Sequence, residues 1–245
     1  MAAPAPLDGA VFPVGVRRVV LDPGHGGKDE GTSREDTDLT EKDLTLDIAR
    51  RLRTLLEESS GAEVLMTRNR DEFVVLKDRA AFANEAGADL FVSIHLNWLE
   101  GRARRGVETF YLGPTEDPYL VELTSRENRQ SGYSLADVRR LLDGIYLDLR
   151  QEQSKALASS VQETLHRSLD EAKPGLRNRG VKPAPFLVLV ATEMPAILAE
   201  VSCLSHRKEV ELLQTDAYRQ RIAEALHEGI DRYARSLSES GVRGS

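Results

Sequence analysis

The stretch Arg17-Arg-Val-Val-Leu-Asp-Pro-Gly-His-Gly-Gly27 sets the first element of the fold. Its apolar residues predict a strand over 17–21, and Pro23 with the glycines around His25 ends that strand in a loop. A second stretch has a similar form, because Asp89-Leu-Phe-Val-Ser-Ile-His95 is a nearly continuous apolar run that ends on a histidine. Such a run is typical of a strand that is covered on both faces. Two predicted strands therefore each lead to a histidine at the carboxyl end.

Strands and helices alternate along the rest of the chain. Helices are predicted from Thr40 to Gly61, over 76–86, across much of 135–170 and from Tyr218 to Tyr233, with further strands over 62–67, 106–112, 186–190 and 196–201 and a basic turn over 175–180. This alternation predicts a single α/β domain with a mostly parallel central sheet and helices on both faces. We expect a leader over 1–15, the domain over 16–235 with a helical insert over 113–155, and a tail over 236–245.

Composition excludes several classes of protein. The net charge of -7 argues against a nucleic-acid binder, which normally carries a basic face. The single cysteine, Cys203, rules out an intrachain disulfide. No apolar run approaches the roughly 20 residues of a membrane span. The first residues lack the features of a signal peptide, so we expect either a cytoplasmic protein or a mature form whose export signal has been removed.

Three residues stand where chemistry is expected in an α/β fold. Ligands bind in the crevice outside the carboxyl ends of the strands, and His25 and His95 can both point into it. A catalytic zinc often takes two histidines and one carboxylate and keeps an open position for water. A further carboxylate must then accept a proton from that water, and Glu200, at the end of the apolar run Pro195-Ala-Ile-Leu-Ala-Glu200, is well placed for this.

Each residue also has a purely structural explanation. A histidine at a strand end is usually a hydrogen-bonded structural residue. Glu41 suits the positive end of a helix dipole wherever a helix begins. Glu200 could be a buried salt-bridge partner. The glycines around His25 could cradle a phosphate, although the stretch lacks the spacing of known phosphate loops.

Eight segments in a fixed order carry a family resemblance. They are Val-Leu-Asp-Pro-Gly-His25-Gly-Gly; Glu41-Lys-Asp-Leu-Thr-Leu-Asp-Ile-Ala; Thr67-Arg-Asn-Arg-Asp; Leu76-Lys-Asp-Arg79 with Ala83-Asn84; Ala88-Asp-Leu-Phe-Val-Ser-Ile-His95-Leu-Asn97; Gly106-Val-Glu-Thr; Arg179-Gly-Val-Lys; and Pro195-Ala-Ile-Leu-Ala-Glu200-Val-Ser-Cys-Leu-Ser. Over about residues 17–233 the chain resembles the zinc-dependent N-acetylmuramoyl-L-alanine amidases. The resemblance implies hydrolysis of the amide between N-acetylmuramic acid and L-alanine of the peptidoglycan stem peptide, in cell-wall remodelling or daughter-cell separation. It also implies a location in the periplasm, in the cell envelope or outside the cell.

The resemblance also assigns roles to residues. It implies zinc ligands at His25, Glu41 and His95, with Glu200 as the catalytic glutamate, and Asn97 is close enough to His95 to contact substrate. A catalytically silent peptidoglycan-binding module and a zinc amidohydrolase of another small amide are the alternatives. We expect Arg79 and Asn84 to serve structure and Arg68 to pair with Asp71.

The insert over 113–155 is longer than a connection of this kind needs. It can be an extra surface helix. It is also similar, at Ser125-Arg-Glu127-Asn128, to the start of a helical insert that covers the zinc in the division-associated amidases until an activator protein displaces it. The resemblance therefore implies an autoinhibitory carboxylate, for which Glu127 is the candidate, and an activator as partner.

Overall fold

The computed structural model describes residues 16–34, 36–99, 105–129, 131–132 and 149–242. Six strands form one sheet in the order β2-β1-β3-β6-β4-β5. The strands are β1 (Arg18–Pro23), β2 (Glu63–Met66), β3 (Leu90–Asn97), β4 (Val107–Leu112), β5 (Asn178–Ala184) and β6 (Ala196–Cys203). Neighbours are parallel except β4 and β6, which are antiparallel, so the β4–β5 pair runs against the other four strands. The prediction of a mostly parallel α/β sheet is confirmed.

Helix α1 (Glu41–Ser60) shows how local sequence sets an element. Thr40 caps it, because its side chain accepts a hydrogen bond from the backbone N–H of Asp43. Apolar residues at helical spacing, including Leu44 and Ile48, are buried against the sheet. Gly61, with φ 65°, ends the helix in the left-handed region that favours glycine. The helix therefore begins at Glu41, which fixes where that carboxylate lies.

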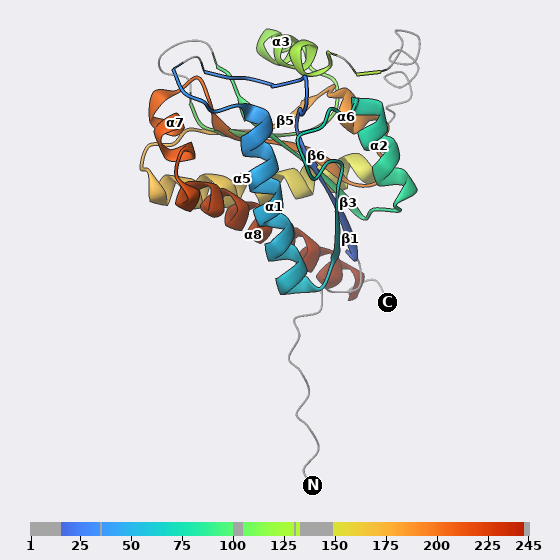
Figure 1. Ribbon diagram of the computed structural model, residues 1–245. Helices are drawn as coiled ribbons and strands as arrows, with labels where there is room; N and C mark the ends of the chain where they lie inside the picture. Colours follow the sequence, from blue (N-terminus) through green and yellow to red (C-terminus); the bar gives the residue numbers. More distant parts are fainter. Residues whose placement is uncertain (1–15, 35, 100–104, 130, 133–148, 243–245) are drawn as a thin grey trace.

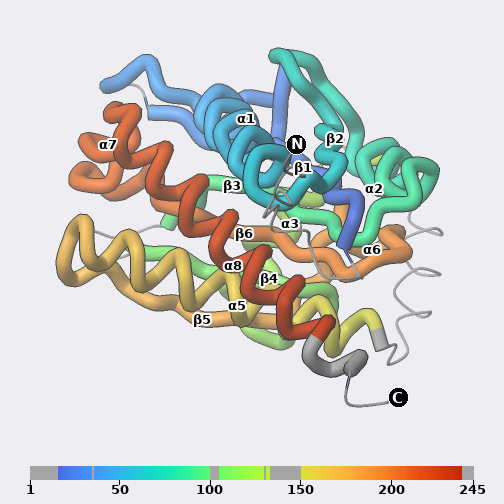
Figure 2. The backbone as a smooth tube through the Cα atoms, turned by 90° about the horizontal axis from the view of Figure 1, so that it is seen from below, coloured from blue at the N-terminus to red at the C-terminus, as the bar shows by residue number. Residues whose placement is uncertain are grey.

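Helices cover both faces of the sheet (Figures 1 and 2). One face packs against α1, α5 (Leu149–Ala172) and α8 (Asp216–Val242), and these elements share the larger apolar core. The other face packs against α2 (Leu76–Glu85), α3 (Pro118–Glu127) and α6 (Leu187–Val190) around a smaller core. A short helix, α7 (Arg207–Leu213), precedes α8. No helix among the described residues is long and apolar enough to cross a membrane.

Several predicted elements differ from the structure. The strand predicted over 186–190 is wrong, since Leu187–Val190 form the short helix α6. Such a brief apolar run suits either element. The turn predicted over 175–180 is in part the start of β5, and α8 continues to Val242 past its predicted end. Helix α7 was not predicted. Helix α3 lies within the predicted helical insert over 113–155, but ahead of the helix that was expected from residue 135. The apolar residues of 135–148 lie outside the described residues.

The sheet face that packs against α2, α3 and α6 changes from apolar to polar side chains toward the carboxyl ends of its strands. Phe91 on β3 and Leu198 on β6 are buried in the smaller core, and side chains alternate between the faces of a strand. Continuing that alternation toward the carboxyl ends of these strands gives His95 on β3 and Glu200 on β6. These two residues are register partners. The apolar face therefore ends in a polar patch, and Figure 1 shows α3 at this end of the molecule.

Candidate metal centre and active site

His25 lies in the loop after β1, and its backbone is held by two buried arginines. It is the one non-glycine residue with positive φ, 60°, among those the structure describes. Arg79 donates hydrogen bonds to the carbonyls of Pro23 (2.8 Å) and His25 (2.7 Å). Arg68 donates to the carbonyls of Pro23 (2.9 Å) and Gly24 (2.8 Å). The loop thus keeps a sparsely populated conformation because buried guanidinium groups bind its carbonyls.

Arg79 also makes a buried ion pair, which accords with the structural role expected of it. Its guanidinium lies 2.8 Å from buried Asp22. Burial by itself raises the pKa of Asp22, but the charge of Arg79 and hydrogen bonds from Thr67 and Ser93 outweigh burial and lower it. The predicted pair of Arg68 with Asp71 is wrong. Asp71 pairs with Lys42 (3.0 Å), and Arg68 donates hydrogen bonds to backbone carbonyls.

Glu41 reaches the same point from the first residue of α1. Its Oε1 accepts a hydrogen bond from the backbone N–H of Leu96 (2.8 Å), and its Oε2 accepts one from that of Thr32 (2.8 Å). Burial raises its pKa, yet the imidazoles of His25 and His95 outweigh burial and hold the pKa well below its usual range. Glu41 is therefore an ionised, fixed carboxylate.

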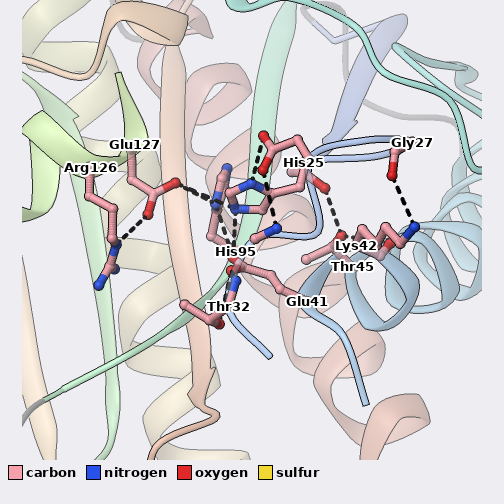
Figure 3. Close-up of polar contacts among 12 residues, drawn as sticks. His25, Gly27, Thr32, Glu41, Lys42, Thr45, His95, Arg126 and Glu127 are labelled. Carbon is pink, nitrogen blue, oxygen red and sulfur yellow. Dashed lines mark hydrogen bonds and ion pairs between the residues drawn. The ribbon is translucent and has the colours of Figure 1, made fainter. Parts of the chain in front are cut away.

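His25, Glu41 and His95 converge on one point with the spacing of a metal site (Figure 3). Glu41 Oε1 lies 3.2 Å from His25 Nε2 and 3.2 Å from His95 Nδ1. A tetrahedral centre with bonds of about 2.0–2.1 Å needs ligand atoms about 3.3 Å apart. His25 Nε2 is buried and makes no hydrogen bond to any described residue. The three residues can therefore hold a metal ion.

Asp29 completes the surroundings of His25. Its Oδ2 lies 3.0 Å from Nδ1 of His25, and the same carboxylate accepts a hydrogen bond from the N–H of Gly31 (3.2 Å). A carboxylate on the outer nitrogen places the proton there and leaves Nε2 with its lone pair free for a metal. Asp29 was not predicted, and its spacing of four residues from His25 is the one signal that could have indicated it.

Glu200 lies beside this centre. It is register partner of His95 on one side and of Glu108, on β4, on the other. Burial raises the pKa of Glu200 well above its usual range, and the carboxylates of Glu41 and Glu127 add to this effect. Its Oε2 is buried without a hydrogen bond to any described residue. A carboxylate of this kind accepts a proton readily.

Glu127 is the last residue of α3, and its carboxylate points toward the three candidate ligands (Figure 3). Its Oε2 lies 3.5 Å from His25 Nε2 and 3.4 Å from His95 Nδ1. Those two separations match two edges of the same tetrahedron, so Oε2 of Glu127 is close enough to act as a fourth ligand. Arg126 pairs with the other oxygen of Glu127 at 3.2 Å. A cavity of about 210 Å³ opens next to this carboxylate and is lined by His25, Asp29 and Thr32 among others.

Asn97 belongs to a second polar cluster that sequence reasoning missed. It is buried, and its amide donates hydrogen bonds to Glu108 (2.6 Å) and to the Tyr119 hydroxyl (2.9 Å). Glu108 is fully buried and lies 3.1 Å from Arg179 and 2.8 Å from Lys182. These residues come from four separate stretches of the sequence, and only the fold brings them together.

Comparisons with known proteins agree on one family. Residues 19–232 match the family described as N-acetylmuramoyl-L-alanine amidase. The chain is 35% identical over 226 residues to N-acetylmuramoyl-L-alanine amidase AmiA of Escherichia coli, covering 89% of this chain and 76% of that protein. It resembles the crystal structure of an N-acetylmuramoyl-L-alanine amidase from Clostridium difficile 630 with a TM-score of 0.70 and 31% identity, over 91% and 98% of the two chains. The CwlD amidase from Clostridioides difficile, solved in complex with the GerS lipoprotein, gives a TM-score of 0.69 and 30% identity, over 90% and 99%.

Proposed function

The chain belongs to the N-acetylmuramoyl-L-alanine amidase family, and from this premise we propose that it cleaves its substrate with a zinc ion held by His25, Glu41 and His95 and with Glu200 as the proton carrier. The reaction is hydrolysis of the amide that joins N-acetylmuramic acid to L-alanine of the peptidoglycan stem peptide. The observation that carries the mechanism is the convergence of Nε2 of His25, Oε1 of Glu41 and Nδ1 of His95 on one point.

Zinc suits this donor set. Two imidazoles and one carboxylate give a site of net charge about +1, typical of catalytic rather than structural zinc. When bound, the ion would polarise the amide carbonyl and lower the pKa of water at that position. Asp29 and the backbone donors to Glu41 orient the ligand atoms, which stabilises the arrangement before any ion arrives.

Glu200 carries the proton in this mechanism. It takes a proton from the attacking water while that oxygen forms its bond to the amide carbon, and it gives the proton to the nitrogen as the C–N bond breaks. The raised pKa of the buried carboxyl favours proton uptake. Asn97, next but one to His95, is proposed to contact the substrate on the β4 side of Glu200.

Metal content and two substitutions test this mechanism. Purified protein should contain about one equivalent of zinc, and His95→Ala should lose it. Glu200→Gln should keep the metal and lose turnover by about 10²–10⁴-fold, the usual contribution of a general base. Full turnover in Glu200→Gln would remove Glu200 from the mechanism. Protein that holds zinc but cleaves no peptidoglycan with Glu200 intact, even as the Glu127→Ala variant, would instead fit a silent binding module.

We also propose that α3 is an autoinhibitory lid. Glu127 lies where a fourth ligand would sit, and a cationic centre in a low-dielectric crevice attracts a carboxylate strongly. Leu120 and Leu123 bury the lid's apolar side in the smaller core. An activator protein that binds this helix would release it. The solved complex of the CwlD amidase with the GerS lipoprotein supports the idea that related amidases take protein partners.

Glu127→Ala tests the lid. It should raise basal hydrolysis of purified sacculi, because the fourth position becomes free for water. Ser125→Ala, an exposed residue of the same helix, is the control. Wild-type basal activity in Glu127→Ala would show that α3 is an added structural helix.

Because the substrate of the family is the cell wall, the protein acts there. We propose the periplasm and daughter-cell separation as its setting, which localisation of a fluorescent fusion would check.

A further inference from the structure

We propose that Tyr119 occupies a substrate subsite, formed by Asn97, Glu108, Arg179 and Lys182, that receives the second stem-peptide residue through its free carboxylate. This inference rests on the amidase reaction proposed above and names the part of the substrate that the site reads. The cluster lies next to Glu200, comes from three strands, and is closed by a side chain from the lid.

The sheet register places the subsite at a fitting distance from the cleaved bond. His95, Glu200 and Glu108 form one row across the adjacent strands β3, β6 and β4, so their side chains share a face. Neighbouring strands lie about 4.8 Å apart. An extended peptide advances about 3.5 Å per residue. A stem peptide that is cut between His95 and Glu200 and crosses the sheet toward β4 covers about one and a half strand spacings, or about 7 Å, to reach Glu108, which is the length of two residues.

The charge of this cluster indicates that it binds the peptide side of the substrate rather than the sugar side. Arg179 and Lys182 both pair with Glu108, which leaves one positive charge in excess. In muramic acid the only carboxyl group is the one in the cleaved amide, so the sugar side offers no anion. The stem peptide does offer one, because its D-glutamate is linked through the γ-carboxyl and keeps a free α-carboxylate.

The contacts of Tyr119 indicate what the subsite accepts. Its hydroxyl donates a hydrogen bond to Glu108 (2.5 Å), and its ring packs 5.1 Å from the Arg179 guanidinium and 5.5 Å from the Lys182 ammonium. A ligand in its place needs a donor toward Glu108 and a negative group toward the cations. The γ-linked D-glutamate has both on one carbon, namely its peptide N–H and its α-carboxylate.

Tyr119 reaches the cluster from outside the sheet. It is the second residue of α3, whereas Glu127 is the last, so one helix covers both the subsite and the candidate metal centre. With a rise of 1.5 Å per residue, the two Cα atoms lie about 12 Å apart along the helix. Departure of the lid therefore frees the metal centre and the peptide subsite together.

Two small muropeptides separate this proposal from its alternatives. MurNAc-L-Ala-D-glutamate and MurNAc-L-Ala-D-isoglutamine differ only in the α-carboxylate, which is an amide in the second. Their Kd values would be measured by calorimetry on protein that carries both Glu200→Gln, so that the ligands are not consumed, and Glu127→Ala, so that the lid is weakened. Lys182→Gln removes one cation and leaves Arg179 to pair with Glu108, Lys182→Arg restores the charge, and Lys173→Gln removes an exposed lysine elsewhere as the matched control.

The acid should bind roughly 10- to 100-fold more tightly than the amide, as expected for a charged hydrogen bond. Lys182→Gln should reduce this ratio nearly to one, while Lys182→Arg and Lys173→Gln keep it. Tyr119→Ala should tighten the acid more than the amide, and Val121→Ala, an exposed neighbour on α3, should change neither.

Equal affinity for both ligands, an unchanged ratio in Lys182→Gln, or the absence of binding would each overturn the subsite. An equal gain in affinity for both ligands in Tyr119→Ala would also overturn it, because Tyr119 would then exclude ligands only by occupying space. Failure of the proposed catalytic mechanism would give a different experimental result. The ligands would bind with the expected ratio, while the parent enzyme with Glu127→Ala would cleave neither of them.

Discussion

Asn128 offers a way to open the lid without touching the candidate metal centre. It follows the last residue of α3, and its amide donates a hydrogen bond to the carbonyl of Pro185 (3.0 Å). Its carbonyl oxygen accepts a second from the N–H of Leu187 (2.8 Å). One side chain thus ties the end of the lid to the connection between β5 and α6. Asn128→Ala removes both bonds and leaves Glu127 in place.

The expected size follows from those two bonds. Each contributes a net of about 1 kcal/mol, so the substitution should favour lid release by about 2 kcal/mol. That corresponds to about a 30-fold increase in the open-to-closed ratio. If nearly every molecule is closed, basal hydrolysis rises by the same factor. If a tenth of the molecules are already open, the gain is limited to about tenfold.

Dye release from labelled sacculi would measure the rate, and zinc content would confirm that the centre is unchanged. Hydrogen exchange of the α3 amides would report lid opening directly. Ser125→Ala controls for a change of helix surface. Faster exchange without faster hydrolysis would refute the inhibitory role of the lid. Unchanged exchange would refute the anchoring role of Asn128.

Three further substitutions test how the centre is held. Asp29→Ala should weaken metal affinity by about 10- to 100-fold in chelator competition, because His25 loses the carboxylate on its outer nitrogen; unchanged affinity would contradict this. Gly24→Ala would place a Cβ 2.5 Å from the His95 ring, so it should cost about 1–3 kcal/mol in denaturant unfolding and lower zinc content; a stable, fully loaded variant would refute that packing. Arg79→Met should cost about 3–5 kcal/mol by leaving Asp22 buried and unpaired. Because the pKa of Asp22 is lowered in the fold, the stability that this pair contributes should be complete above pH about 4 and be lost only at more acid pH. Denaturant unfolding of the wild type and of Arg79→Met at several pH values would measure this. A loss of stability well under about 3 kcal/mol in Arg79→Met at neutral pH would contradict a buried ion pair.

Local signals in the sequence were enough for the elements that carry the proposed ligands. Thr40 caps α1 and Gly61 ends it, so Glu41 could be placed at a helix start. His25 and His95 follow or end apolar runs that could only be buried strands. The general rule for the carboxyl ends of parallel strands then brought the two histidines to one crevice. These inferences needed only neighbours in sequence.

Features that depend on contacts distant in sequence could not be predicted in this way. The reversed direction of β4 and β5 has no local signature, yet it places Glu108 opposite Glu200. Four apolar residues at 187–190 fit a strand or a helical turn equally well. Helix α3 did have signals that were overlooked, because Asp117 caps it and Pro118 occupies its first position. The resemblance to a family indicated Glu127 where periodicity did not.

The row of His95, Glu200 and Glu108 makes the site an indicator of how the chain has folded. A slip of one residue between β3 and β6 would turn Glu200 to the opposite face of the sheet, away from His95. The pairing joins segments more than a hundred residues apart, and contacts of that kind form late and slowly. Misregistered chains would still be compact but would lack a working centre. The fraction of active sites in a preparation should therefore report the fidelity of strand pairing, and slow refolding should restore activity later than it restores helix content.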